Sequence, residues 1–436
     1  MGGAGVNGAA GTGSSGAGTG GAGGNGDGQD RAGDQRYPHG SPKYRRTLIA
    51  LFCAGFANFA LMYAPQGLLP EIATRFGVTA DAASWVIGAT TIGVAAGVLP
   101  LARLSDRIGR VTLIRWTLVA SIVLGVLSVV APTFALLITA RLLLGVALAG
   151  VPAMAVTVLA ESIHPRALGA AVGTYIAGTT LGGLAGRIAA ATGAGWWGLD
   201  GGLLAVVALA AVATLVYLVT MQQTVVSRSS SLPFWPALLS NLRNPGVMVL
   251  VAQAFLLMGG FVATYNYITF RLEAPPFGLS LAQVSWLFLA YLGGTLSSRL
   301  VWRIAGDRDP TRTLLATLAL MLGGLALTLV SSLPVIVVGV IIYTAAFFAA
   351  HSIASGLIDR RAHRTGVSLA PPLYYLGYYA GSSLLGWLGG VAFIGAGWTG
   401  TISMVAGAIV VSGLLAWWAR GSRPREGTGS TPLPNT

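Results

Sequence analysis

The feature that most constrains this chain is a series of long stretches without a single charged residue. Five of them span residues 47–70, 82–102, 167–186, 201–227 and 244–270. Each reaches the roughly 20 apolar residues that a helix rising about 1.5 Å per residue needs to cross a hydrocarbon core about 30 Å thick. Only 9% of the 436 residues are charged, against about 25% in an ordinary soluble domain. The sequence therefore predicts an all-α membrane protein.

Breaks at proline, glycine and arginine divide the chain into twelve expected transmembrane helices. They lie near residues 47–69, 82–103, 112–131, 133–160, 167–188, 198–221, 245–270, 280–303, 312–332, 334–358, 365–389 and 396–419. Two long charge-free runs require an internal break. We place these breaks at residues 331–334 and in the glycine-rich stretch 389–397.

The distribution of basic residues predicts the orientation. With the N-terminus inside, 22 of the 26 Lys and Arg residues fall in segments on the inner side, and only Arg75 and Arg271 fall outside. Because basic loops concentrate on the cytoplasmic side, both termini are expected in the cytoplasm of a multi-pass inner (plasma) membrane protein. The net charge of +13 does not indicate a nucleic-acid partner, since the basic residues lie between apolar spans rather than on a soluble module.

Several chemistries are excluded by what the sequence lacks. Cys53 is the only cysteine, and the histidines at 39, 164, 351 and 363 show no close ligand spacing, so we expect no metal. The single lysine, Lys43, follows a proline, which excludes a phosphate-binding loop and argues against primary ATP-driven transport by this chain alone. We expect no cofactor.

Weak internal repeats indicate two halves. The run Tyr175-Ile-Ala-Gly-Thr-Thr-Leu-Gly-Gly183 matches Tyr378-Tyr-Ala-Gly-Ser-Ser-Leu-Leu-Gly386, 203 residues later, and Gly55-Phe56 matches Gly260-Phe261. Repeats of this kind predict two pseudo-symmetric six-helix bundles with a site between them near the midplane. We expect a disordered Gly-rich cytoplasmic tail at 1–43, bundles at 44–221 and 245–420, a cytoplasmic linker at 222–244 and a cytoplasmic tail at 421–436.

The turn between the second and third spans carries the most specific motif, Ala102-Arg-Leu-Ser-Asp106-Arg107-Ile-Gly109-Arg110-Val111. An ordinary basic turn on the inner side is the alternative explanation. At this point the chain resembles the major facilitator superfamily, whose signature here is Gly-x-Leu-x-Asp-Arg-x-Gly-Arg-Arg/Lys; Ala102 and Val111 depart from it. The resemblance implies a major facilitator fold, with a conformational switch formed by Asp106, Arg107, Gly109 and Arg110. It also implies that Asp106 docks against the start of the eleventh span, near residue 365, when the protein faces outward.

Charged residues within the spans are the next candidates. Arg141-Leu-Leu-Leu-Gly145 resembles the Arg-x-x-x-Gly motif of the superfamily. A charge in a span costs about 2.5–3.5 kcal/mol on insertion scales, so a retained one faces a cavity or a partner, unless it reaches an interface by snorkelling. For Arg187 as well, the alternative explanation is that the side chain anchors the span at a membrane interface. We group Arg141, Gly145, Arg187 and Glu161 as candidates for charge coupling.

A glycine motif lies in the fifth span. Gly178, Gly182 and Gly183 resemble the Gly-Pro-x-x-Gly-Gly motif of antiporter branches of the superfamily, with Thr179 in place of the proline. Plain helix packing explains small residues at this spacing equally well.

A longer match points to one branch. The runs 175–187, Phe255-Leu-Leu-Met-Gly-Gly-Phe261 and Tyr265-Asn266-Tyr267-Ile-Thr-Phe-Arg271-Leu resemble the acriflavine-sensitivity group of drug-efflux permeases. The resemblance covers roughly residues 44–420.

The acidic residues bear on the cargo, because all thirteen fall in tails, loops or helix ends. An exporter of cations is expected to hold a carboxylate at mid-membrane, so the sequence favours neutral, apolar or anionic cargo. Polar and aromatic residues of three spans are the candidates for the cavity: Asn58, Tyr63, Gln66, Gln253, Tyr265, Asn266, Tyr375 and Tyr378.

The sequence thus predicts a secondary active exporter of small organic molecules or drugs that alternates between inward- and outward-open states. Its partners are the lipid bilayer, a small-molecule cargo and protons, and proton antiport is implied by the resemblance. An importer or exchanger of a small organic anion is the alternative, with Arg141 and Arg187 as charge partners. A membrane-bound enzyme or sensor has only His351-Ser352 in its favour, without an acid, so we expect no enzyme.

Overall fold

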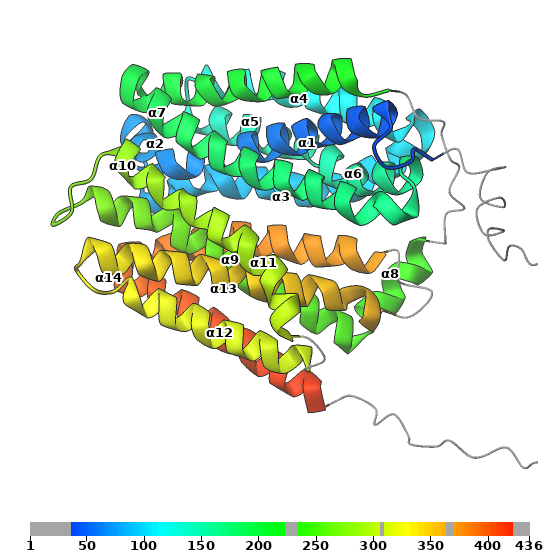
Figure 1. Cartoon of the computed structure of the whole chain (residues 1–436). Helices are drawn as coiled ribbons and strands as arrows, with labels where there is room; N and C mark the ends of the chain where they lie inside the picture. Colours follow the sequence, from blue (N-terminus) through cyan, green and yellow to red (C-terminus); the bar gives the residue numbers. More distant parts are fainter. Residues whose placement is uncertain (1–35, 223–233, 306–308, 363–368, 422–436) are drawn as a thin grey trace, which may run out of the picture. The chain divides into compact units, whose positions relative to one another are not determined.

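The computed structural model describes residues 36–222, 234–305, 309–362 and 369–421 (Figure 1). Most of the expected tail at 1–43 lies outside these ranges, as do residues 223–233 of the expected linker at 222–244 and the C-terminal tail beyond residue 421. Residue 365, where we place the start of the eleventh span, also lies outside them.

The described residues form a succession of helices. The first half contains α1 (Pro42–Tyr63), the 3-10 helix η1 (Ala64–Leu68), α2 (Leu69–Phe76), α3 (Ala80–Ile108), α4 (Arg110–Val129), α5 (Phe134–Leu148), α6 (Gly150–Ser162) and α7 (Pro165–Thr220). The second half contains α8 (Phe234–Leu242), α9 (Pro245–Glu273), α10 (Leu281–Ser285), the 3-10 helix η2 (Trp286–Leu289), α11 (Ala290–Ala305), α12 (Pro310–Leu327), α13 (Leu333–Arg361) and α14 (Ala370–Gly421).

Two of these helices are hairpins of two spans each. In α7 the helical geometry is interrupted at Trp197 and Gly198, and in α14 at Ala396 and Gly397, where both glycines have positive φ. Glycine adopts that conformation without a steric penalty. In Figure 1 each of these ribbons turns back on itself at this point.

The expected fold is confirmed. Within the described ranges, nine helical segments are long and apolar enough to cross a membrane. Dividing α7 and α14 at their kinks, and counting α10 to α11 as one further span, accounts for all twelve expected helices. The helices α1 to α7 pack mainly on one another, as do α9 to α14, and α3 packs on α14 where the two groups meet.

The internal repeat recurs in the helix packing. A methyl group on Gly178 would lie 2.4 Å from the carbonyl oxygen of Phe52, and one on Gly381 would lie 2.0 Å from that of Phe255. Both partners in the second pair lie 203 residues after those in the first. The fifth and eleventh spans therefore approach the first and seventh spans in the same way, as pseudo-symmetric halves require.

The linker contains a helix that the sequence did not predict. Helix α8 exposes Trp235, Leu239 and Leu242 at helical spacing. Asn244 follows it and caps α9, because its Oδ1 atom accepts from the backbone N–H of Gly246 over 2.9 Å.

The turns of the chain distinguish two ends of the helices. We call the end that holds the turns at Gly77, Gly198, Gly278 and Gly397 the far end, and the end where α1, α7 and α9 begin the near end. In the orientation expected from the sequence, the far end is outside the cell.

Candidate functional site

Arg187 forms a polar connection between the two halves. It lies in the far half of the first span of α7 and is 2% exposed. Its Nε and Nη2 atoms donate to Oε1 of Gln66 over 3.0 and 2.6 Å, and Gln66 donates in turn to Oδ1 of Asn266 over 2.8 Å. Nη2 also donates to the hydroxyl of Tyr291 over 3.3 Å. Because Arg187 and Gln66 belong to the first half, and Asn266 and Tyr291 to the second, this network joins the halves.

Aromatic rings enclose the guanidinium group of Arg187. Its central carbon lies 5.1 Å from the ring centre of Tyr63 and 4.9 Å from those of Phe288 and Tyr291. The ring of Tyr265 packs 5.2 Å from Tyr291. Cations are attracted to aromatic faces at these distances, so the charge is held without a carboxylate.

A second contact between the halves lies on α3 and α14. The hydroxyls of Thr91 and Ser383 are 2.6 Å apart, and Ser383 donates to the carbonyl oxygen of Gly88 over 3.0 Å. Closer to the far end, the rings of Trp85 and Trp387 lie 6.1 Å apart. We call this contact and the Arg187 network together the far gate, since both lie toward the far end.

Arg141 stabilises a break in the first span. It is 4% exposed, and its Nη1 and Nη2 atoms donate to the carbonyl oxygens of Leu61 over 3.0 Å and of Met62 over 2.8 Å. Pro65 has no N–H to offer Leu61, and the helix changes to 3-10 geometry here, so these carbonyls need other donors. Nε donates to Val86 of α3 over 3.2 Å. The side chain therefore does not snorkel to an interface.

A cluster of rings surrounds His351 on α13. Nδ1 of His351 is 2.9 Å from the hydroxyl of Tyr374, and the ring of Tyr378 lies 5.1 Å from the imidazole. Tyr375 contacts Tyr378 at 6.0 Å between ring centres and is 44% exposed. The predicted cavity residues of the eleventh span thus gather around a histidine.

Two predicted cavity residues stand apart from both groups. Asn58 is fully buried on α1, and neither its Nδ2 nor its Oδ1 atom has a hydrogen-bond partner. Gln253 is also buried, and its Nε2 atom donates to the carbonyl oxygen of Ser412 over 3.4 Å. Buried polar groups without partners are rare in native structures, so Asn58 remains a candidate for cargo binding.

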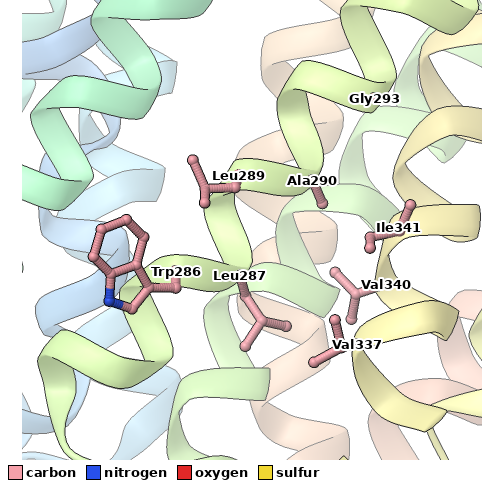
Figure 2. Close-up of a pocket in the computed structure, with 8 residues that line it drawn as sticks. All are labelled: Trp286, Leu287, Leu289, Ala290, Gly293, Val337, Val340 and Ile341. Atoms are coloured by element: carbon pink, nitrogen blue, oxygen red, sulfur yellow. The ribbon is translucent and has the colours of Figure 1, made fainter. Parts of the chain in front are cut away.

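An apolar groove lies between helices of the second half (Figure 2). Its volume is about 330 Å³, and it lies between the segment that runs from η2 into α11 and the start of α13. The lining residues are Trp286, Leu287, Leu289, Ala290, Gly293, Val337, Val340 and Ile341. None of the predicted cavity residues is among them.

Comparison with known proteins identifies the family. Residues 51–370 match the family model of the Major Facilitator Superfamily. The chain belongs to this superfamily.

Relatives cover nearly the whole chain. The Inner membrane transport protein YnfM of Escherichia coli (strain K12) is 35% identical over 88% of this chain and 92% of its own. The Uncharacterized MFS-type transporter YybF of Bacillus subtilis (strain 168) is 33% identical over 89% and 95%. The crystal structure of the nucleoside transporter NupG has the same fold, with a TM-score of 0.73 at 13% identity over 86% of this chain and 99% of its own. The chain is thus a transporter of the major facilitator type and not an enzyme.

The superfamily signature lies at the near end. Asp106 is exposed and lies 3.7 Å from Arg110, which forms a closer ion pair with Glu161 at the end of α6. Arg107 is exposed, and Gly109 has a φ of 89°, which allows the turn between α3 and α4. The partner expected for Asp106, at the start of the eleventh span, lies outside the described residues. Glu161 thus belongs to this charge cluster and not to Arg141 or Arg187.

Gly145 and Gly182 of the two remaining superfamily motifs pack against backbone. A methyl group on Gly182 would lie 2.1 Å from the carbonyl oxygen of Phe56, and one on Gly145 would lie 2.0 Å from that of Thr90. A methyl group on Gly183 would lie 3.2 Å from Nη1 of Arg187. These contacts support the packing interpretation of the motifs.

Sequence reasoning missed several residues of the site. Tyr291 and Phe288 stand out only as aromatic residues in an apolar span, which interface anchoring also explains. The sequence did contain a signal for Ser383, because this residue matches Thr180 in the internal repeat. For His351, the sequence offers only an enzyme interpretation.

Proposed function

We propose that the protein is a secondary active exporter of small organic molecules, driven by proton antiport and working by alternating access. The observation that carries this proposal is the far gate. The two halves meet there through hydrogen bonds and cation–aromatic contacts between side chains, which can separate while each bundle stays intact. Such a contact is what two rocking bundles need, because each must remain intact while their interface opens.

Export rests on the likeness of three runs, at 175–187, 255–261 and 265–272, to the acriflavine-sensitivity group of drug-efflux permeases. The proposed orientation places both termini in the cytoplasm and the far end outside, in the inner membrane. It rests on the excess of basic residues on the inner side. A reporter that is active only outside the cytoplasm, fused after residue 436, should be inactive. Activity would reverse the orientation.

The buried charges bear on the kind of cargo. Arg141 and Arg187 are both buried, and no ion pair is recorded for either within the described ranges. A positive charge held by carbonyls, an amide and rings disfavours a cationic cargo nearby. The tyrosines around Tyr378 offer faces and hydroxyls to a neutral aromatic molecule. We therefore propose neutral, apolar or anionic cargo.

One observation favours a second function, import or exchange of a small organic anion. Oε1 of Gln66 receives two N–H groups of Arg187, a geometry that a carboxylate oxygen also fits. In this function the anion would bind near Arg187 once the far gate opens.

Flux into proteoliposomes separates the two functions. The protein is reconstituted with its near end outward, and the probes are benzoate, a neutral aromatic dye and acriflavine. An exporter should accumulate a probe when the lumen is acidic, because protons leaving drive the probe inward. An importer coupled to protons should instead empty vesicles preloaded with benzoate. If the protein binds at least one probe but transports none of them in response to the pH gradient, both functions are contradicted.

A further inference from the structure

The described spans contain few groups that can carry a proton at neutral pH. Every described acidic residue lies within three residues of a helix end or kink: Glu71, Asp81, Asp106, Glu161, Asp200, Glu273, Asp309 and Asp359. Arginine, tyrosine and cysteine titrate at higher pH. Histidine is the side chain that ordinarily changes charge between about pH 5 and 8. Among the described histidines, His39 and His164 precede helices, whereas His351 lies within α13, ten residues before its end.

His351 is placed so that its protonation affects a second helix. Its Nδ1 atom is 2.9 Å from the hydroxyl of Tyr374 on α14, and its ring lies 5.5 Å from that of Tyr374 and 5.1 Å from that of Tyr378. One turn after Tyr379, on the same helix, Ser383 makes the contact with α3 in the far gate. A change at the imidazole thus acts directly on the helix that joins the halves.

A continuous series of rings also connects His351 to Arg187. The imidazole stacks on Phe347 at 6.0 Å, and Phe347 stacks on Phe261 at 3.9 Å. Phe261 packs on Tyr291 at 5.5 Å, and Tyr291 contacts the guanidinium group of Arg187. Both contacts of the far gate are therefore within reach of a rearrangement around His351.

The surroundings of the imidazole are aromatic rather than charged. Helix α14 presents the phenols Tyr374 and Tyr378 to the imidazole. Helix α9 contributes Phe261, which stacks on Phe347 and does not contact the imidazole directly. On the other helices that pack against α13, the charged groups lie elsewhere: Arg299, Arg303 and Arg312 are exposed, and Arg271 and Glu273 lie at the far end of α9. A proton on His351 therefore changes the charge of its site without a competing neighbour.

We propose that His351 is the proton-binding residue of the transport cycle, an inference that rests on the proposed proton-coupled function. In the neutral tautomer with its proton on Nε2, the hydroxyl of Tyr374 donates to Nδ1. When a second proton binds, both nitrogens become donors, so Nδ1–H donates to the Tyr374 oxygen and the hydroxyl proton must turn away. The imidazolium is then attracted to the aromatic faces of Phe347 and Tyr378. Release of the same proton on the other side of the membrane reverses these changes.

The test needs no cargo, because the proton is the ligand. In protein with Cys53→Ser, spin labels are attached at Thr79→Cys and Gly395→Cys, two exposed far-end positions, one in each half. Distances between the labels are measured in nanodiscs from about pH 5.5 to 8. We expect two distance populations whose ratio changes with pH. His351→Gln, which can hydrogen-bond but not take up a proton, should keep both populations and lose the pH response. His164→Gln, outside the spans, should respond as the parent protein does.

Three outcomes would overturn the proposal. The first is that the distance ratio of the parent protein does not change with pH. The other two concern His351→Gln, which would show either an unchanged pH response or only one distance population. If His351→Gln does not fold, Tyr374→Phe removes only the hydroxyl and should shift the midpoint of the response; an unchanged midpoint then counts against His351. Transport is tested separately by the proteoliposome fluxes. Gradient-driven flux together with a pH-independent ratio would refute the role of His351 and leave the transport function standing.

Discussion

Arg141 and Arg187 are held in different ways, and the difference predicts different roles. Arg141 bonds to three backbone carbonyls within the first half, so it stabilises that half in every conformation. Arg187 also contacts two side chains of the second half, Phe288 and Tyr291, so its surroundings must change when the far gate opens. Arg141 is thus expected to affect stability, and Arg187 the transport cycle.

Replacement of Arg141 tests this distinction. Arg141→Ala leaves the carbonyls of Leu61 and Met62 without their donor, and a buried group left without a partner costs about 1–3 kcal/mol. We expect a lower midpoint of thermal unfolding, measured in detergent by tryptophan fluorescence. Arg75→Ala, which removes an exposed ion pair with Asp200, should change the midpoint little. Equal midpoints for both variants would mean that the carbonyls find other donors.

Asn58 makes the opposite prediction. Its amide is fully buried without a partner, so Asn58→Leu removes an unsatisfied polar group rather than a hydrogen bond. The unfolding midpoint should stay equal or rise. If the amide serves cargo in another state of the cycle, flux in proteoliposomes should fall in the same variant. Normal flux would assign Asn58 no part in transport.

At the scale of elements, α1 and α7 depend on glycine for their close approach. A methyl group on Gly182 would lie 2.1 Å from the carbonyl oxygen of Phe56, whereas one on Gly173 of the same helix would meet nothing within 4 Å. Gly182→Ala should therefore separate the helices and destabilise the protein by about 1–3 kcal/mol.

Gly173→Ala is the matched control for this effect, because it adds the same methyl group to α7 where space is open. Its unfolding midpoint should equal or exceed that of the parent protein, since alanine favours a helix more than glycine does. If Gly182→Ala is as stable as Gly173→Ala, the approach of α1 to α7 tolerates a larger side chain than the structure indicates.

At the scale of the whole molecule, the far gate is closed in this structure, and Asp106 at the near end is exposed. We propose that Asp106 binds the positive N-terminal end of the eleventh span when the far gate opens. Such a contact is worth about 0.3–1 kcal/mol when exposed and up to about 2 kcal/mol when partly buried. Since about 1.4 kcal/mol changes a ratio tenfold, this is enough to shift a balanced equilibrium.

Asp106→Asn should therefore favour the state with the closed far gate and slow the cycle. The spin labels at Thr79→Cys and Gly395→Cys report the population directly, and proteoliposome flux reports the rate. Arg46→Gln is the control, because it removes an exposed charge at the near end that lies outside the superfamily signature. Lost transport with an unchanged distance ratio would assign Asp106 another task, such as proton transfer.

The sequence alone determined the number of spans, their approximate positions and the two-fold internal repeat. These features are encoded along one dimension: a span needs about 20 apolar residues, and the repeat leaves matched glycines such as Gly178 and Gly381. The sequence also singled out Arg141 and Arg187, because a charge within a span is conspicuous by itself. It did not reveal α8, whose nine residues are too few for a periodic signal.

Only the tertiary structure decided which of these residues meet. Gln66 and Arg187 are 121 residues apart, and Gln66 and Asn266 are 200 apart. Spans that are apolar on every side carry no periodic signal to show which face turns toward a neighbour. The rotation of each helix is set by close packing at glycines and by the hydrogen-bonding needs of buried polar groups. Those needs placed Arg187 between the halves and His351 beside Tyr374, which no pattern along the chain indicates.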